Sequence, residues 1–338
     1  MRLLFAAGLM ALATACGPSA PASPSADDIA AESKKLTAYL NAEFEEELAM
    51  NPTMLTSMGR KELYDQLGDF SEADAAKQLE WRRESVAGMK AAIDPAKLSD
   101  DAKTSWAIWE LELDRSELRA KWQRYSYIFG YGGPHTDLPN FLITYHKVDQ
   151  PSDMDAYVAR IAALGPAIDQ ATERAKLAVA DGIRAPKFGY ERTALEAKNV
   201  ITGAPFGPGA DSPLLEDVKK KAADLQTAGK ATPEQVAAWT AGAEAALKDK
   251  MKPAYERLIA WLEADMPNAL SGKVGALTLP KGPEWYDVSL QLQTTTKMTA
   301  DEIHQLGLAE VKRIHAEIDK IRVATGFQGD QKAFFTFM

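Results

Sequence analysis

The sequence predicts a mostly α-helical fold, a multi-helix array with long loops and room for one or two short strands. Apolar residues recur along most of the chain at the spacing of about 3.6 residues that one face of a helix requires. Capping boxes, which are helix-start signals, lie at Thr232 to Gln235 and at Thr299 to Glu302. Segments rich in glycine and proline separate these stretches. Together the three observations indicate helices joined by loops.

The expected helices can be placed in order from their start signals. They begin at Ser25, Ser71, Ser99, Ser152, Arg192, Leu214, Thr232 and Thr299. The first ends at Asn51-Pro52 because the residue before proline disfavours helix. The fourth is long, ends at Gly182 and is expected to kink at Gly165-Pro166. The last ends at Gly326 and carries an apolar stripe of Ile303, Leu306, Val311, Ile314, Ile318 and Ile321.

Two segments near the C-terminal end are ambiguous. Leu277 and Leu279 alternate with other residues within 268–280, which favours a short strand there. Residues 284–293 fit both a half-buried strand and a helix. Pro283-Glu284 is a typical helix start, and it tips the prediction towards a helix.

Residues 125–139 interrupt the helical pattern with three glycines and two prolines, so they are predicted to form a loop. The segment also carries four aromatic residues, Tyr125, Tyr127, Phe129 and Tyr131. These side chains pack the loop onto the core or line a pocket, and the first alternative is favoured.

The N-terminus has the pattern of an export signal over residues 1–15. A short basic start and an apolar run are followed by small residues and then by Cys16, the one cysteine of the chain. This junction resembles a bacterial lipobox, with Ala13 where leucine is usual, and the resemblance implies cleavage before Cys16 and lipid attachment to its sulfur. Residues 16–26 are rich in proline and serine and are expected to be a flexible tether. The remaining 27–338 would face the periplasm from the bacterial cell envelope, with the membrane as partner.

Composition narrows the function without assigning one. A chain of 338 residues with net charge −9 is too acidic for nucleic acid to be its main partner. None of the four histidines stands in a close-spaced metal pattern, and no nucleophile elbow, phosphate loop or dinucleotide fingerprint occurs. Glu310 and Glu317 project near the apolar stripe of the last helix, where pairing with Arg313 is the simpler explanation. These residues alone predict no catalytic or metal-binding group and no cofactor in this chain.

Two groups of segments resemble a known family. The first comprises DLPNFLITYHKV at 137–148, DAYVARI at 155–161 and GIRAP at 182–186. The second comprises LPKG at 279–282 and TTTKMTADEIHQLGL at 294–308. Together they resemble the DUF885 family of bacterial proteins, which are often exported lipoproteins and are similar to helical zinc metallopeptidases of the zincin type.

The resemblance implies a hydrolase whose zinc motif, a His-Glu-x-x-Pro-Gly-His-like sequence, falls after the threonine-run segment. This sequence stops at Phe334-Phe335-Thr336-Phe337-Met338 before any such motif. The expectation is therefore an N-terminal part of a longer zinc peptidase, truncated at its C-terminus, with exposed phenylalanines at its end. Zinc and a peptide substrate are expected only in that longer parent.

The residues named for one wall of the parent's cleft are Gly132, Gly133, His135 and His304. The competing hypothesis is a non-enzymatic periplasmic lipoprotein with a binding or envelope scaffold role. Whether the chain belongs to an enzyme is left open by its own residues.

Overall fold

The structure is a computed structural model that describes residues 24–338; Cys16, the expected signal and most of the expected tether lie outside this range. Within it the chain forms helices joined by turns and loops, with isolated bridges and no strand. The mostly α-helical prediction is confirmed. The short strand considered within 268–280 is absent, and its place is taken by single 3-10 turns at Met266–Asn268 and Ala276–Thr278. Glycines and prolines there favour turns over the extended backbone that leucine alternation suggested.

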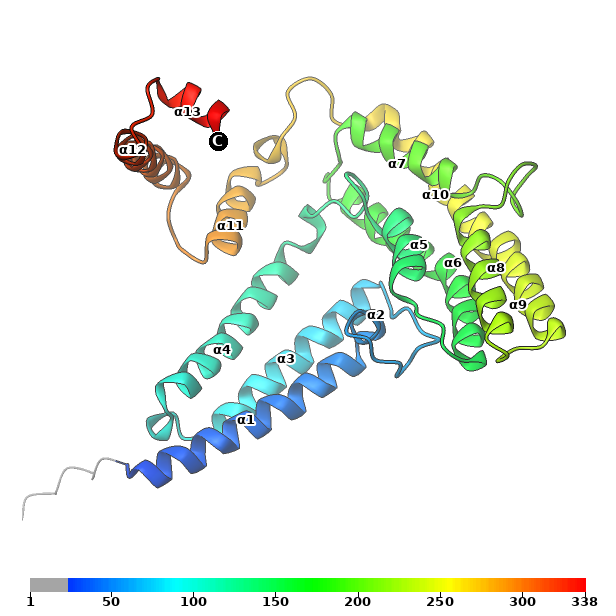
Figure 1. Ribbon diagram of the computed structural model, residues 1–338, viewed down its shortest axis with the longest axis horizontal. Helices are drawn as coiled ribbons and strands as arrows, with labels where there is room; N and C mark the ends of the chain where they lie inside the picture. The colour runs from blue at the N-terminus through cyan, green and yellow to red at the C-terminus, as the bar shows by residue number, and fades with distance from the viewer. Residues whose placement is uncertain (1–23) are drawn as a thin grey trace, which may run out of the picture.

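The N-terminal part is an arm of three long helices, α1 (Ala26–Ala49), α3 (Glu72–Ala92) and α4 (Asp100–Lys121), which lie side by side in Figure 1. Each begins at a serine whose side chain accepts a backbone N–H of the first turn, as the sequence predicted. The arm has a small core of its own, formed by Leu36, Met89, Ile93, Leu98 and Ala102. The short helix α2 (Pro52–Ser57) leads from α1 towards the rest of the molecule.

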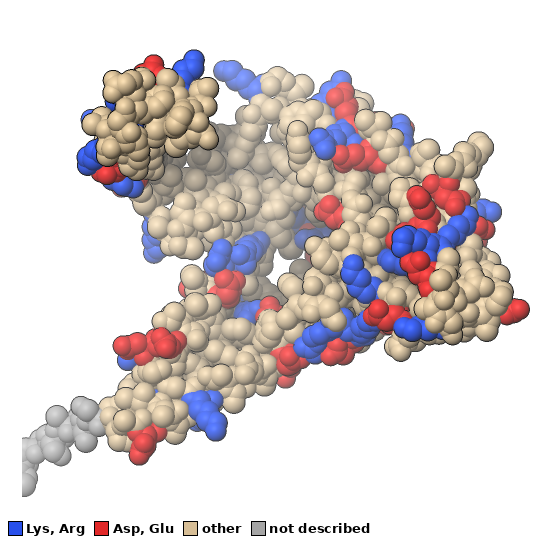
Figure 2. Space-filling model, viewed as in Figure 1, with Lys and Arg blue, Asp and Glu red and all other residues tan. Residues whose placement is uncertain are grey.

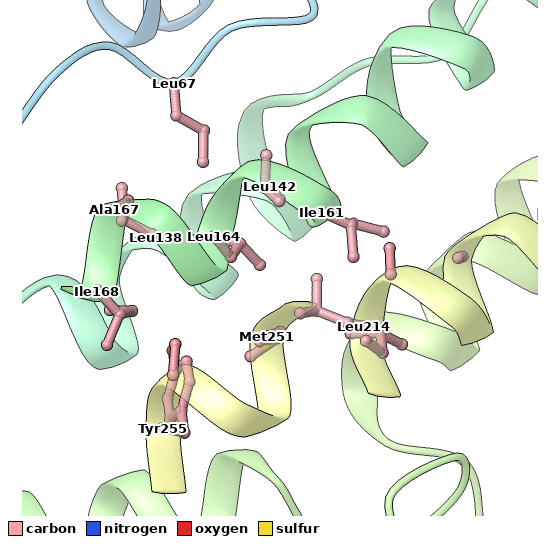
Figure 3. Packing of buried hydrophobic residues seen from close by; sticks show 14 of the residues in the cluster. Leu67, Leu138, Leu142, Ile161, Leu164, Ala167, Ile168, Leu214, Met251 and Tyr255 are labelled. Atoms are coloured by element: carbon pink, nitrogen blue, oxygen red, sulfur yellow. The ribbon is translucent and has the colours of Figure 1, made fainter. Parts of the chain in front are cut away.

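The largest core surrounds one long helix, α6 (Pro151–Ala180). The elements packed around it are α5 (Pro134–Tyr145), α7 (Lys187–Val200), α8 (Pro213–Thr227), α9 (Pro233–Ala246), a π turn (Leu247–Met251) and α10 (Lys252–Asp265). Figure 3 shows Ile161, Leu164 and Ile168 of α6 among the apolar side chains of these neighbours. All three are fully buried, so α6 is the element on which the other helices pack.

Gly165 explains how closely α6 and the π turn approach. A Cβ atom at this position would lie 2.4 Å from the backbone oxygen of Lys250, so only glycine fits without movement. The helix continues through the neighbouring Pro166 to Ala180. The Gly165-Pro166 pair therefore lies within one continuous helix, at the place where α6 contacts the π turn.

The predicted loop over residues 125–139 is shorter than expected because α5 begins at Pro134 and includes Pro139. Proline at the first helical position is favourable, whereas an internal proline has no N–H for the carbonyl four residues earlier. That carbonyl belongs to His135, and it accepts a hydrogen bond of 2.6 Å from the Tyr255 hydroxyl. A side chain of α10 thus replaces the missing backbone donor.

Arg160 of α6 connects the main core to the arm. Its side chain is completely buried, and its guanidinium donates to the backbone oxygen of Gln66 at 2.9 Å and to the Thr56 hydroxyl at 2.7 Å. It also donates to the Nδ1 atom of His146 at 3.1 Å. Burial lowers the pKa of Arg160 to about 10, so the group stays charged at neutral pH.

His146 is held as a neutral ring by the same contacts. A guanidinium can only donate, so Nδ1 is the acceptor and the ring proton lies on Nε2. That atom donates to the backbone oxygen of Asp153 at 2.8 Å, and the Tyr64 ring stacks on the imidazole with 4.0 Å between centroids. Burial, aided by the charge of Arg160, lowers the pKa of His146 to about 4.

The C-terminal part consists of α11 (Gly282–Thr294), α12 (Ala300–Ala324) and α13 (Gln331–Phe337), which Figure 1 shows apart from the main core. The helix favoured over residues 284–293 is confirmed. Most of the apolar stripe of α12 is solvent-exposed, including Leu306, Val311, Ile314 and Ile321. Phe335 and Phe337 are exposed as expected, but Phe334 is buried against Phe327, so its predicted exposure was wrong.

Two surface properties complete the description. Among residues 24–338 no helix combines the length and apolarity needed to cross a membrane. Figure 2 shows acidic and basic side chains interspersed over the visible face, with no large area of one sign.

We predict that acid weakens the fold through His146. The imidazole takes up a proton near pH 6.5 when unfolded but only near pH 4 when folded, so its stabilising contribution is complete above the first value and falls as pH drops towards the second. The loss should reach about 3 kcal/mol. Urea unfolding of wild type and His146→Gln across this range measures it as a pH-dependent difference. A constant difference between the two proteins would contradict the prediction.

Candidate functional site

The backbone before α5 makes a close turn that requires glycine. Gly133 has φ of 137°, and a Cβ atom there would lie 2.4 Å from the backbone oxygen of Ile128. Gly132 also has positive φ, at 94°, and its backbone oxygen accepts a hydrogen bond of 3.2 Å from the N–H of Gly130. The two predicted glycines therefore fold residues 128–133 back on themselves.

His135 follows this turn in the first turn of α5 and is completely buried. Its Nε2 atom lies 3.1 Å from a carboxylate oxygen of Glu196 on α7, and its Nδ1 atom has no hydrogen-bond partner among the described residues. Burial lowers the pKa of His135, while Glu196 acts in the opposite direction. The edge of the Phe129 ring packs against the imidazole with 5.6 Å between centroids. The arrangement joins the aromatic segment, α5 and α7.

Phe129, which contacts His135, also lines a hollow between the aromatic segment and α6, α7 and α10. Its volume is about 40 Å³, enough for a few water molecules or a small side chain. Tyr127 and Phe129 line it from the loop, and Tyr190 and Trp261 line it from α7 and α10. The fully buried hydroxyl of Thr193 borders it without a hydrogen-bond partner in the described chain.

The four loop aromatics thus divide between the two predicted roles. Tyr127 and Phe129 line the hollow. Tyr125 packs against Trp122 and Trp285, which joins the segment to α4 and α11. Tyr131 is 85% exposed and stacks with the guanidinium of Arg192, 4.3 Å from the ring centroid. Packing and pocket formation are therefore both present in one segment.

His304 lies elsewhere. It is exposed near the start of α12, which Figure 1 places across the molecule from α5. The structure brings Gly132, Gly133 and His135 together but does not bring His304 to them. Glu310 pairs with Arg313 as expected, at 2.8 Å, and Glu317 pairs with Lys320 instead.

A resident metal does not fit the described residues. A zinc site needs at least three protein ligands, usually histidine, cysteine or carboxylate. His135 has one such neighbour, Glu196, and no three side chains of these kinds within residues 24–338 lie close enough to share an ion.

Sequence reasoning missed the strongest polar features of the core. Thr193 and Arg160 lie in ordinary helical patterns, and no motif marks them as buried polar residues. The one available signal was position, because Arg160 lies on the apolar face of its helix between Tyr157 and Leu164.

The geometry defines a class of protein in which helices pack on a central long helix. The segment of residues 125–133, called here the aromatic turn, covers a small hollow. The chain belongs to the DUF885 family, described as bacterial protein of unknown function, whose model matches residues 52–338.

Among solved structures the chain is similar to the crystal structure described as "the putative lipoprotein from Colwellia psychrerythraea". The sequences are 16% identical and the TM-score is 0.70, over 88% of this chain and 52% of that one. The chain therefore spans about half the length of the Colwellia protein, and the likeness is one of fold. Comparison with curated proteins gives no match.

Replacement of Gly133 by alanine should destabilise the protein by about 2 kcal/mol or more, because the backbone there is strained for other residues. The new Cβ atom would also meet the backbone oxygen of Ile128. Gly207→Ala is the matched control, since a Cβ atom there meets nothing within 4 Å. Urea unfolding of both variants tests this. Equal stabilities would show that the turn tolerates a side chain.

Proposed function

We propose that this chain is the N-terminal helical part of an exported hydrolase of the zinc-peptidase class, held at the cell envelope by a lipid on Cys16 and facing the periplasm. The chain belongs to the DUF885 family, and the zinc-peptidase class rests on the resemblance described in the sequence analysis. The observation that carries the proposal is the match in fold to about half of a longer protein, itself described as a putative lipoprotein.

In this proposal the chain contributes a scaffold and one wall of a peptide-binding cleft. The turn at Gly132 and Gly133 and the buried His135 would form the fixed part of that wall. His304, exposed on α12, would contribute only if the remainder of the parent packed between α12 and the main core. No catalytic step is assigned to a residue of this chain, because the described residues do not provide a set of zinc ligands.

A second function, a non-enzymatic periplasmic lipoprotein that binds a ligand, is favoured by a different observation. A groove lined by arginines lies between α3 and α4. Such a groove would bind a ligand without any help from a zinc-bearing half.

Metal content and the gene separate the two functions. The full 338-residue chain should carry no stoichiometric zinc and should not cleave peptides, because its metal ligands would lie in the parent. The reading frame of the peptidase should continue past Met338 and encode His-Glu-x-x-Pro-Gly-His. The product of that frame should bind one zinc and lose activity when the motif's glutamate is changed to glutamine. A stop codon directly after Met338 would reject the peptidase, and one tightly bound zinc in the 338-residue chain would reject the assignment of ligands to the parent.

The lipid anchor has its own test. Cys16→Ser should abolish processing before residue 16 and release the protein from the membrane fraction, since the thioether to the lipid cannot form. Intact mass and fractionation in a bacterial host provide the measurements. Ser19→Ala, three residues downstream, is the matched control and should behave as wild type. An unchanged mature mass and unchanged membrane association in Cys16→Ser would eliminate the anchor.

A further inference from the structure

A second hollow lies in the arm, where α3 and α4 diverge towards the end nearest α6 (Figure 1). It is a groove of about 380 Å³ between the first half of α3 and the last turns of α4. Met50, just after α1, and Arg174 of α6 also line it. This volume falls within the several hundred Å³ that small-molecule sites occupy.

The walls of the groove are mostly apolar. Ala75, Leu79 and Trp81 line it from α3, and Ala120 lines it from α4. Two amide side chains, Gln78 and Gln123, add hydrogen-bonding groups. A ligand with an apolar or aromatic body could therefore lie along the groove with its polar end directed elsewhere.

The charged residues of the groove are mainly arginines. Arg82, Arg119 and Arg174 line it, whereas Glu47 is its one carboxylate among the described residues. Glu47 is already engaged by Arg82. In a chain of net charge −9, a groove with three guanidinium groups and one paired carboxylate is an exception.

Two of these arginines have structural partners. The Arg82 side chain is 10% exposed, and its guanidinium lies between the rings of Trp81 and Trp109, at 4.7 and 4.5 Å from their centroids. Arg119 lies 3.6 Å from Glu112 on its own helix. Both therefore already have a partner within the protein.

Arg174 differs because it forms no salt bridge with a carboxylate of residues 24–338. The nearby Glu72 is bound by Arg124 at 2.8 Å, and its pKa is lowered mainly by that bond and further by the charge of Arg174. Its Nη1 atom donates a long hydrogen bond of 3.4 Å to the backbone oxygen of Phe70, and its Nε atom is buried without an acceptor in the described chain. Nη2 makes no hydrogen bond to residues 24–338. A half-buried guanidinium is costly unless an anion or several acceptors engage it.

We propose that this groove is a binding site for a small organic anion, a carboxylate attached to an apolar or aromatic body. The carboxylate would meet the Nη2 side of Arg174, the geometry that favours arginine over lysine for carboxylates. The body would lie between α3 and α4 against Leu79 and Trp81. The site shares Gln123 and Arg174 with the hollow under the aromatic turn, but it does not depend on the proposed peptidase.

The test uses a matched pair of probes that differ only in charge. N-acetylphenylalanine should bind the full chain in isothermal titration calorimetry, and N-acetylphenylalaninamide should bind at least about tenfold more weakly, because hydrogen bonds to charged groups are the stronger kind. Equal affinity for the two probes, or no binding of the acid at millimolar concentration, would overturn the proposal.

Variants locate the site on Arg174. Arg174→Gln should weaken the acid by about tenfold or more and leave the amide unchanged, while Arg174→Lys should recover only part of the affinity. Arg257→Gln, which removes an exposed ion pair with Asp169 on another face of α6, is the control and should bind as wild type. Circular dichroism melts verify that each variant is folded. Unchanged binding in folded Arg174→Gln would refute the assignment.

The apolar body is tested separately. Inorganic phosphate and acetate should compete with N-acetylphenylalanine only weakly, because neither fills the space beside Leu79 and Trp81. Ala120→Phe, which adds a ring to the groove wall, should also weaken the acid. Tight competition by phosphate would contradict a site built for a carboxylate with an apolar body.

Discussion

The buried charge of Arg160 is the constraint on which the arrangement of the N-terminal arm and the main core depends. A guanidinium removed from water must keep its donors satisfied, and here the acceptors come from three separate places: α2, the segment before α3, and His146 after α5. All three acceptors are neutral, so hydrogen bonds and not an ion pair offset the cost of removing the guanidinium from water. Displacement of the arm from α6 would remove the acceptors on Thr56 and Gln66. The junction therefore has one low-energy position.

That fixed position creates the groove further along α6. Arg174 follows Arg160 by fourteen residues, which is about 21 Å along a helix. Where α6 leaves the junction, α3 and α4 diverge, and the space between them is lined by side chains from four helices or their ends. The hollow under the aromatic turn borders the same part of α6, and both Arg174 and Gln123 line the two hollows. Two sites thus share one wall, each with its own chemistry.

The sequence predicted what is local. Capping boxes at Thr232 and Thr299 and serine caps at Ser25, Ser71 and Ser99 start helices where expected, because capping depends on a few neighbouring residues. Residues 125–139 were misjudged at their end, since helix formation across Pro139 relies on a hydroxyl from Tyr255, distant in sequence. The candidate wall residues were found from a resemblance, and their neighbour Glu196 was not. Partners that meet only through tertiary contacts leave no local pattern.

The π turn between α9 and α10 has a consequence for how the helices are phased. It inserts one residue beyond regular α-helix, and each helical residue turns the following side chains by about 100°. The insertion sets the rotation of α10 so that Tyr255 meets the carbonyl of His135 while the carbonyl of Lys250 meets Gly165. A deletion of one residue here would keep every helix and change the face that α10 presents to its neighbours. The number of residues in the π turn therefore determines whether Tyr255 can reach His135, which lies more than a hundred positions earlier next to the aromatic turn.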